Sequence, residues 1–244
     1  MATSALIEEL LDVAPLERMI GRPRSSTRSR GTLGAVLYLA SFQYFLVQLI
    51  VAQRWTPGYS VRLNTISDLA NSACGRFNGR YVCSPWHDLM NASFVLLGLT
   101  MVAGSLLVRR ALRGSRTRDV GFLLLGIGGL GVVMVGLFSE NSYATLHGIG
   151  ATLPFLVGNV GLVLLGLKLE APRALRIYTF VSGALALVAL GFYARSLDLG
   201  LGEGGMERIV AYPQTLWLIV FAAYDLVTRA RTRRSDVTDR SARA

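Results

Sequence analysis

Apolar residues lie along the chain in six blocks, and the segments between the blocks carry most of the charges. Each block is roughly 20 residues long, which is the length that an α-helix needs to cross the hydrocarbon core of a bilayer. No small-residue cleavage site follows the first block, so we expect it to stay in the protein as a span. The pattern predicts six membrane-spanning helices, near residues 33–53, 86–108, 119–138, 146–168, 174–194 and 207–228.

The composition agrees with a membrane protein and leaves little room for a soluble domain. Hydrophobic residues make up 52% of the 244 residues and charged residues only 16%, whereas about a quarter of a soluble domain is charged. We therefore expect an all-α fold, a polytopic transmembrane helical bundle. Its predicted parts are an N-terminal tail 1–32, a membrane domain 33–228 with an outer loop 54–85, and a basic C-terminal tail 229–244.

The net charge of +10 is explained by where the arginines lie. Because positive charge favours the cytoplasmic side of a membrane, we predict cytoplasmic N- and C-termini and a multi-pass protein of the cell membrane. Topology and attraction to anionic lipid head groups account for these arginines, so the expected partners are membrane lipids and not nucleic acid. Most of the arginines fall in alternate segments, namely 1–32, 109–118, 168–176 and 229–244.

Both cysteines, Cys74 and Cys83, fall in the outer loop 54–85. This loop faces an oxidising compartment in the predicted orientation, so we expect a disulfide between them. A reduced pair or a metal-binding pair is the alternative, but a lone pair at this spacing is a poor zinc signature.

Glycine and proline indicate how the helices pack. The chain has 26 glycines, and several lie in the third and fourth spans, where small residues let helix backbones approach closely. A phosphate-binding loop is disfavoured because no strand precedes these glycines. Pro154 and Pro213 lie in the outer halves of the fourth and sixth spans and each removes a backbone hydrogen bond. Two kinks at similar depth fit an outward-facing cavity, and they fit kinked packing without a cavity equally well.

Polar residues gather on one side of the predicted bundle. The starts of the second, fourth and sixth spans share the outer surface, because successive spans alternate in direction. Ionisable groups within a membrane usually face a cavity or a partner, so we hypothesise one outer-facing polar pocket in which Arg208 pairs with a carboxylate. The candidate pocket residues are Asp68, His87, Asp88, Asn91, Glu140, His147, Glu207, Arg208 and Tyr212.

The alternative interpretation needs no pocket, since helix ends at an interface are normally polar. His87 and Asp88 follow Ser84 and Pro85, a pattern typical of an N-terminal cap with an acid in the first turn. His147 would then only donate a hydrogen bond to a loop carbonyl. The sequence leaves both interpretations open.

The candidate catalytic residues are His87, Asp88, Glu140 and His147, as acid/base groups or metal ligands. His87 and His147 are weak metal candidates, because no HxxxH or HExxH spacing exists, and no cofactor is predicted. A serine hydrolase would lack its GxSxG elbow, and a transporter would lack charges at the bilayer centre. A retinal Schiff base is excluded, because the only lysine, Lys168, lies at the cytoplasmic end of the fourth span.

Short motifs in the chain are Thr65–Leu69, Ser84–Asn91, Gly136–Glu140 followed by His147–Ala151, and Tyr212–Trp217. In order and spacing they resemble a bacterial integral membrane family catalogued as domain of unknown function 998, over roughly residues 33–228. The resemblance implies a bundle of about six helices and no established activity. The entry into the fourth span is also distantly similar to Frag/DRAM/Sfk-like membrane proteins, which are linked to lipid organisation. A weaker similarity is to ceramidases and progestin/adipoQ-type receptors, which use three histidines around zinc where this chain has two.

Three functions from different classes follow. The first is a membrane protein that binds or organises lipid or a partner through the outer pocket. The second is a membrane-embedded, hydrolase-like enzyme, metal-dependent in one version, that acts on a lipid-linked substrate. The third is a small-molecule transporter. A membrane-protein partner or a second copy of the chain is compatible with each of them.

Overall fold

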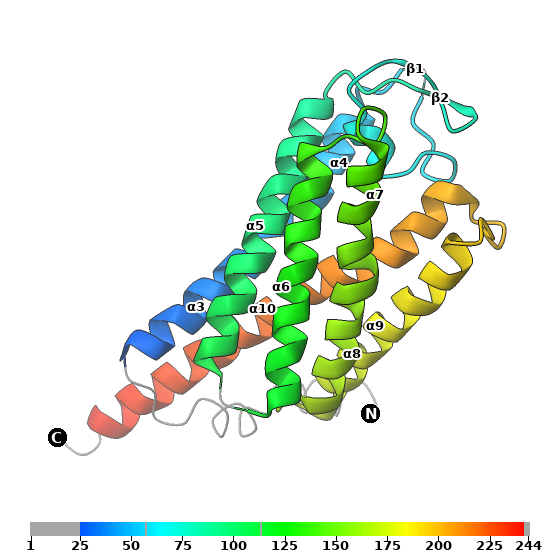
Figure 1. The fold of residues 1–244 in the computed structure, drawn as a ribbon. Coiled ribbons are helices and arrows are strands. Elements are labelled where there is room, and N and C mark those ends of the chain that lie inside the picture. The colour runs from blue at the N-terminus through cyan, green and yellow to red at the C-terminus, as the bar shows by residue number, and fades with distance from the viewer. Residues whose placement is uncertain (1–24, 57, 113, 242–244) are drawn as a thin grey trace, which may run out of the picture.

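The computed structural model describes residues 25–241 except residues 57 and 113, and it describes side chains from residue 29 to residue 233. Most of the predicted N-terminal tail, residues 1–24, lies outside the described residues. Within them the fold is a bundle of long helices with a small hairpin at one end (Figure 1). The helices are α3 (Ser25–Ala40), α4 (Gln43–Ala52), α5 (His87–Ala111), α6 (Arg116–Leu137), α7 (Ala144–Thr152), α8 (Asn159–Lys168), α9 (Arg173–Tyr193) and α10 (Gly202–Ser241).

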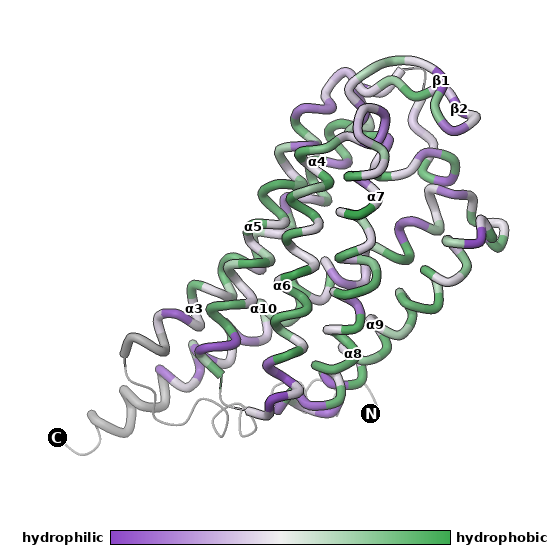
Figure 2. The backbone as a smooth tube through the Cα atoms, viewed as in Figure 1, coloured by the Kyte–Doolittle hydropathy of each residue, from purple (hydrophilic) through white to green (hydrophobic). Residues whose placement is uncertain are grey.

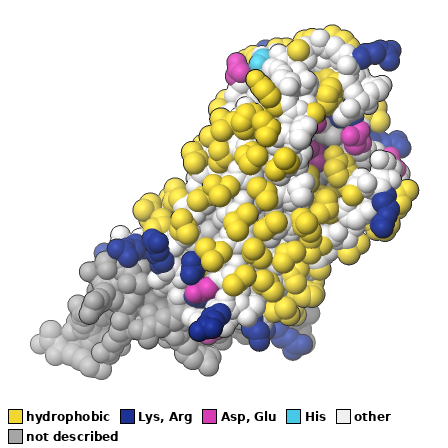
Figure 3. Space-filling model, viewed as in Figure 1, with side chains coloured by type: hydrophobic (Ala, Val, Ile, Leu, Met, Phe, Trp, Pro, Cys, Tyr) yellow, Lys and Arg dark blue, Asp and Glu magenta, His cyan; other side chains and the backbone are white. Residues whose placement is uncertain are grey.

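Six helical segments of the described chain are long and apolar enough to cross a membrane, which confirms the predicted fold class. α3 and α4 together form the first segment, and α7 and α8 together form the fourth. Hydrophobic residues occupy the middle of these segments in Figure 2, and in Figure 3 Lys and Arg side chains gather below an apolar middle zone. The segments are Ser29–Ala52, His87–Ala111, Arg116–Leu137, Ala144–Lys168, Arg173–Tyr193 and Gly202–Arg233.

The start of α3 and the end of α10 lie at the same end of the bundle (Figure 1), as an even number of spans requires. We call this the inner end, and the end that carries the loop 54–85 the outer end. Assignment of the inner end to the cytoplasm stays a prediction from the arginine distribution.

The last helix is longer than predicted. The sequence pattern ended the sixth span at residue 228, yet α10 continues without a break to Ser241. No glycine or proline interrupts residues 229–241, so nothing in that stretch stops helix propagation. The helix also carries an ion pair, in which Arg229 Nε lies 2.6 Å from an oxygen of Asp225, and both side chains are buried.

The outer loop contains a two-stranded hairpin of β1 (Gly75–Phe77) and β2 (Arg80–Val82). Asn78 and Gly79 join the strands with positive φ angles of 46° and 78°, as a two-residue hairpin turn requires. The strand register places Cys74 and Cys83 opposite each other just beyond the strands, and the two are joined by the predicted disulfide. The disulfide therefore closes the base of the hairpin.

Pro154 lies in a π-helical turn, η2 (Leu153–Gly158), which separates α7 from α8. A π-turn leaves carbonyls without their usual helical partner. The fully buried Asn159 bonds to them through its amide nitrogen, at 3.0 Å from the oxygen of Phe155 and 3.4 Å from that of Pro154. The same nitrogen lies 3.4 Å from the oxygen of Val210, so the distorted turn is tied to α10.

Close approach of backbones at glycine, as predicted, joins several helix pairs. A Cβ atom at Gly98 of α5 would lie 2.5 Å from the backbone oxygen of Gly129 and 2.6 Å from the nitrogen of Val133, both on α6. By contrast, a Cβ atom at Gly148 of α7 would meet nothing within 4 Å. The α5–α6 contact thus requires glycine, and the position of Gly148 does not.

We expect Gly98→Ala to lower the free energy of unfolding by about 1–3 kcal/mol, because backbone atoms cannot yield to the added methyl group. Gly148→Ala is the matched control and should be neutral or stabilising by up to about 1 kcal/mol, because alanine favours helix. Thermal unfolding of both variants in detergent measures the difference. Equal melting temperatures would contradict the close contact between α5 and α6.

Candidate functional site

The segment 59–71 covers the outer ends of the helices and includes the short 3₁₀ helix η1 (Ser67–Ala70). We call this segment the roof. Glu207, in the first turns of α10, holds this roof. Its carboxylate accepts hydrogen bonds from the backbone N–H of Ile66, from that of Ser67 at 3.4 Å and from the Ser67 hydroxyl at 2.9 Å. Glu207 is only 3% exposed, so these donors replace the water that a carboxylate would otherwise need.

Arg208 holds the other side of the roof. Its guanidinium donates to the carbonyl oxygens of Val61 at 3.0 Å, Asn64 at 2.9 Å and Gly204 at 2.7 Å, and also to the Tyr59 hydroxyl. The expected pairing of Arg208 with a carboxylate is not among these bonds. Arg208 instead orders the loop backbone through several fixed donors, which suits a planar guanidinium.

Asp68 is fully buried within the roof and binds Arg80 of the hairpin in a two-pronged ion pair. The Arg80 Nε and Nη2 atoms lie 2.6 and 3.0 Å from the two carboxylate oxygens, an arrangement that fixes geometry as well as charge. The Arg80 Nη1 atom reaches Glu203 of α10 at 2.5 Å. Sequence reasoning missed Arg80, since nothing in a hairpin strand indicates which carboxylate its side chain reaches.

Glu140, in the loop between α6 and α7, completes an acidic cluster with Asp68 and Glu207. Its Oε1 atom accepts a hydrogen bond from the Asn71 amide at 3.3 Å. Burial, followed by repulsion from Asp68 and Glu207, raises the pKa of Glu140 to about 9. Glu140 therefore carries a proton at neutral pH and contributes no charge.

His147, near the start of α7, is fixed through both ring nitrogens. Its Nδ1 atom lies 2.8 Å from the Phe138 carbonyl oxygen, which can only accept, so Nδ1 carries the proton. Its Nε2 atom lies 3.1 Å from the Ser67 hydroxyl oxygen. The Ser67 hydroxyl thus lies between the His147 imidazole and the Glu207 carboxylate. Because a hydroxyl group has one proton, it can donate to only one of the two at a time.

The structure separates His87 and Asp88 from this network. His87 contacts the Ser84 carbonyl at 3.0 Å and Asp88 at 3.3 Å, and the Asp88 side chain is 94% exposed. Asn91 touches the margin of the roof, donating to the Ala70 oxygen at 3.1 Å. Within the described residues no group of three or more His, Cys, Asp or Glu side chains is placed to hold a metal ion.

The cap expected before His87 takes another form. Trp86 occupies the N-cap position of α5 and makes no capping hydrogen bond with its side chain. The Ser84 hydroxyl instead donates to the Leu69 carbonyl oxygen at 2.7 Å. The Ser84 side chain therefore stabilises the roof and does not cap α5. Asp88 remains in the first turn of α5, where a negative charge is favourable.

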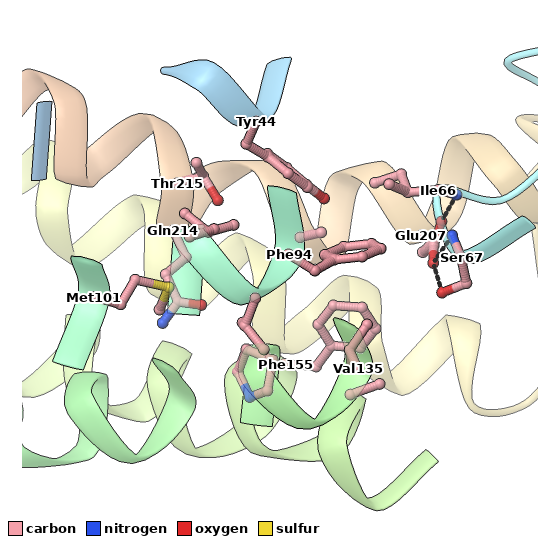
Figure 4. Close-up of a pocket in the computed structure, with 15 residues that line it drawn as sticks. Tyr44, Ile66, Ser67, Phe94, Met101, Val135, Phe155, Glu207, Gln214 and Thr215 are labelled. Atoms are coloured by element: carbon pink, nitrogen blue, oxygen red, sulfur yellow. Dashed lines mark hydrogen bonds between the residues drawn. The ribbon is translucent and has the colours of Figure 1, made fainter. Parts of the chain in front are cut away.

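A cavity of about 40 Å³ lies beneath the roof, inside the bundle (Figure 4). Ser67 and Glu207 line its outer end, and Gln214 and Thr215 lie about two turns further along α10. The walls between them are largely apolar. They come from Phe94, Leu97 and Met101 of α5, Val132 and Val135 of α6, Ala151 of α7, and Pro154 and Phe155 of η2.

Two polar groups at this cavity lack partners within the described part of the chain. Gln214 is 4% exposed, and its side-chain nitrogen has no hydrogen-bond partner. Tyr44 of α4 is 3% exposed and lines the same cavity, and no hydrogen bond of its hydroxyl group is found. By contrast, Tyr212, a predicted pocket residue, donates to the Gln48 side-chain oxygen at 2.8 Å. Gln214 directly follows Pro213. Pro213 and Pro154 were the residues from which the sequence suggested a cavity in the outer half of the bundle.

Comparison with known proteins gives one family. A family model described as protein of unknown function, DUF998, matches residues 11–224. No curated protein and no solved structure matches the chain.

The raised pKa of Glu140 makes stability depend on pH. The folded protein keeps this proton up to about pH 9, whereas the unfolded chain loses it near the ordinary value of 4.5. The folded state therefore binds more protons between these values, and its free energy of unfolding falls as pH rises through the window. We expect Glu140→Gln to flatten this fall in melting temperature between pH 5 and 9. Glu170→Gln, at an exposed inner position, should keep the wild-type slope, and an unchanged slope in Glu140→Gln would contradict the assignment.

Arg208→Lys tests the roof itself. A lysine keeps the charge but cannot bond three carbonyls and a phenol at once, so we expect faster hydrogen exchange in residues 59–66 by about tenfold. Arg62→Lys is the matched control, because Arg62 lies in the same loop and is exposed. Exchange measured by mass spectrometry that is equal in both variants would show that Arg208 does not hold the loop.

Proposed function

We propose that this chain, which belongs to the DUF998 family of proteins of unknown function, binds a lipid or another amphipathic molecule in the outer half of its helical bundle. The chain is an integral membrane protein with six spans. The proposal covers both the binding itself and the chemical class of the ligand.

The observation that carries the proposal is the amide nitrogen of Gln214, which lies unpaired in the wall of the cavity. A buried amide without a partner costs roughly 1–3 kcal/mol, and the fold leaves Gln214 in that state at the deep end of a cavity with largely apolar walls. A ligand with an apolar body and a hydrogen-bond acceptor would satisfy the Gln214 amide and the Tyr44 hydroxyl together. Such a combination of apolar walls and few polar groups is typical of ligand sites.

The size of the cavity sets a condition on this binding. About 40 Å³ has room for a few water molecules, since one needs roughly 10–15 Å³, and an acyl chain needs more. The side chain of Met101 is flexible enough to move aside, and it faces Gln214 in Figure 4. We expect ligand binding to widen the cavity on this side.

A second candidate function is a membrane hydrolase, which the contact between Ser67 and His147 favours. A histidine with Nδ1 fixed by a carbonyl and Nε2 beside a serine hydroxyl is the geometry of a general base and its nucleophile. However, the backbone N–H groups of Ile66 and Ser67, which would stabilise an oxyanion, are engaged by Glu207. Transport has less support, because no charged side chain among the described residues lines the cavity below Glu207. Binding is therefore the better-supported proposal.

The binding proposal is tested by filling the cavity. Ala211→Phe places a ring in the cavity, whereas Ala223→Phe adds the same ring at an exposed position of α10. Mass spectrometry of lipids retained by the purified protein should show at least a tenfold loss in Ala211→Phe and no loss in Ala223→Phe. Gln214→Met, which keeps side-chain length, should weaken retention without lowering the melting temperature. Equal retention in all variants would refute the site.

The hydrolase candidate has its own readout. A fluorophosphonate probe should label Ser67 in the wild-type protein and lose that label in His147→Gln if Ser67 is an activated nucleophile. Absence of labelling at Ser67 in folded protein removes this candidate and leaves the binding proposal intact.

A further inference from the structure

The disulfide-closed hairpin lies at the outer end of the bundle and follows the roof directly in sequence (Figure 1). Each of its two strands has only three residues, and an isolated two-stranded hairpin is marginally stable in water. The bond between Cys74 and Cys83 joins the chain at the base of the hairpin, which restricts the conformations open to the segment between them. The hairpin therefore depends on this bond for a defined shape.

Contacts from the hairpin and its last residues hold the short helix η1 of the roof in place. Arg80, in β2, forms the two-pronged ion pair with Asp68, whose side chain is fully buried. The Ser84 hydroxyl, one residue beyond Cys83, donates to the Leu69 carbonyl oxygen at 2.7 Å. Arg80 and Ser84 thus lie on either side of Cys83 in sequence and bind adjacent residues of η1.

The position of η1 determines whether the outer end of the cavity is covered. Ser67, the first residue of η1, lines that end together with Glu207, to which it is bonded (Figure 4). A buried charge that loses its partner is strongly destabilised, so loss of Arg80 favours a conformation in which η1 turns Asp68 toward water. Such a movement displaces Ser67 and uncovers the cavity.

The two sulfur atoms of the disulfide differ in their accessibility to a reductant. Cys74 is exposed, whereas Cys83 is only 8% exposed. The Thr56 hydroxyl donates a hydrogen bond to Cys83 Sγ at 3.8 Å, and such a donor stabilises a thiolate on that atom. An external thiolate can therefore attack Cys74 Sγ with Cys83 as the leaving group.

We propose that the Cys74–Cys83 disulfide is a redox-sensitive switch that keeps the roof closed over the cavity, and that a dithiol reductant opens the roof. One thiolate of the dithiol bonds to Cys74 Sγ, the S–S bond breaks, and its electron pair stays on Cys83 Sγ, which takes up a proton. The second thiol of the reductant then closes the reductant's own disulfide and releases Cys74 as a thiol. Two electrons and two protons pass from the dithiol to the protein. What the cavity holds rests on the proposed function, but the opening of the roof does not.

Hydrogen exchange of the roof measures the opening in the full-length protein in detergent. The backbone N–H groups of Ile66 and Ser67 are bonded to Glu207, so their exchange requires the roof to open. Dithiothreitol should accelerate exchange in residues 66–70 of the wild-type protein about tenfold and leave α9 unchanged, while the intact mass gains two hydrogen atoms. Unchanged exchange in the reduced protein would overturn the proposal. So would a disulfide that dithiothreitol does not reduce while the protein is folded.

Matched arginine variants show whether the disulfide acts through Arg80. Arg80→Gln should accelerate roof exchange with the disulfide intact, and reduction should then add less than about twofold, because the contact that reduction releases is already lost. Arg76→Gln is the control, since Arg76 lies in the same hairpin and is exposed, and it should match the wild-type protein in both redox states. Full acceleration on reduction of Arg80→Gln would overturn the link through Arg80.

Lipid retention separates this proposal from the proposed function. Reduction should lower the amount of lipid that the wild-type protein retains about fivefold, because an open roof leaves fewer molecules in the binding-competent state. Faster roof exchange with no lipid retained in either redox state would support the switch and contradict the lipid site. Lipid retention in both states with an equally protected roof would contradict the switch and leave the lipid site intact.

Discussion

The hydrogen bonds from the loop backbone to the Glu207 carboxylate are the constraint on which the outer half of this protein depends. A carboxylate that is 3% exposed is costly unless donors surround it. The donors come from Ile66 and Ser67, 141 and 140 residues away in sequence. The loop therefore needs α10 for its position, and α10 needs the loop to supply hydrogen-bond donors to its buried carboxyl group. The neighbouring Arg208 strengthens the same junction from the other side.

This junction has a consequence for chemistry. Ser67 lies between Glu207 and His147 because the roof is held in place, and the same bonds occupy the N–H groups that an acyl-transfer reaction would use. The roof therefore closes the outer end of the cavity, but it offers no free backbone N–H group of Ile66 or Ser67 to stabilise an oxyanion. Glu140, neutral at pH 7, lies beside Asp68 and Glu207 without adding a charge to the cluster.

The two ends of α10 have different roles. Its outer turns fasten the loop and line the cavity, while its inner turns carry the Asp225–Arg229 pair against α3. Between them Val210 is bonded to Asn159 at the π-turn. A single helix therefore joins the cavity in the outer half of the bundle to the buried ion pair at the inner end.

The sequence by itself determined the six spans and the region of the disulfide, because both follow from local patterns. Apolar blocks of span length and two cysteines within one outer loop need no partner from elsewhere in the chain. It also predicted that Glu140, His147 and Glu207 share one end of the bundle, since alternating spans fix depth, and the structure has all three at the outer end. Their actual partners were decided only by the tertiary structure. The Arg80–Asp68 pair, the exclusion of His87 and the unpaired Gln214 depend on how helices rotate and how the loop folds back, and hydropathy carries no information about rotation when lipid and core are both apolar.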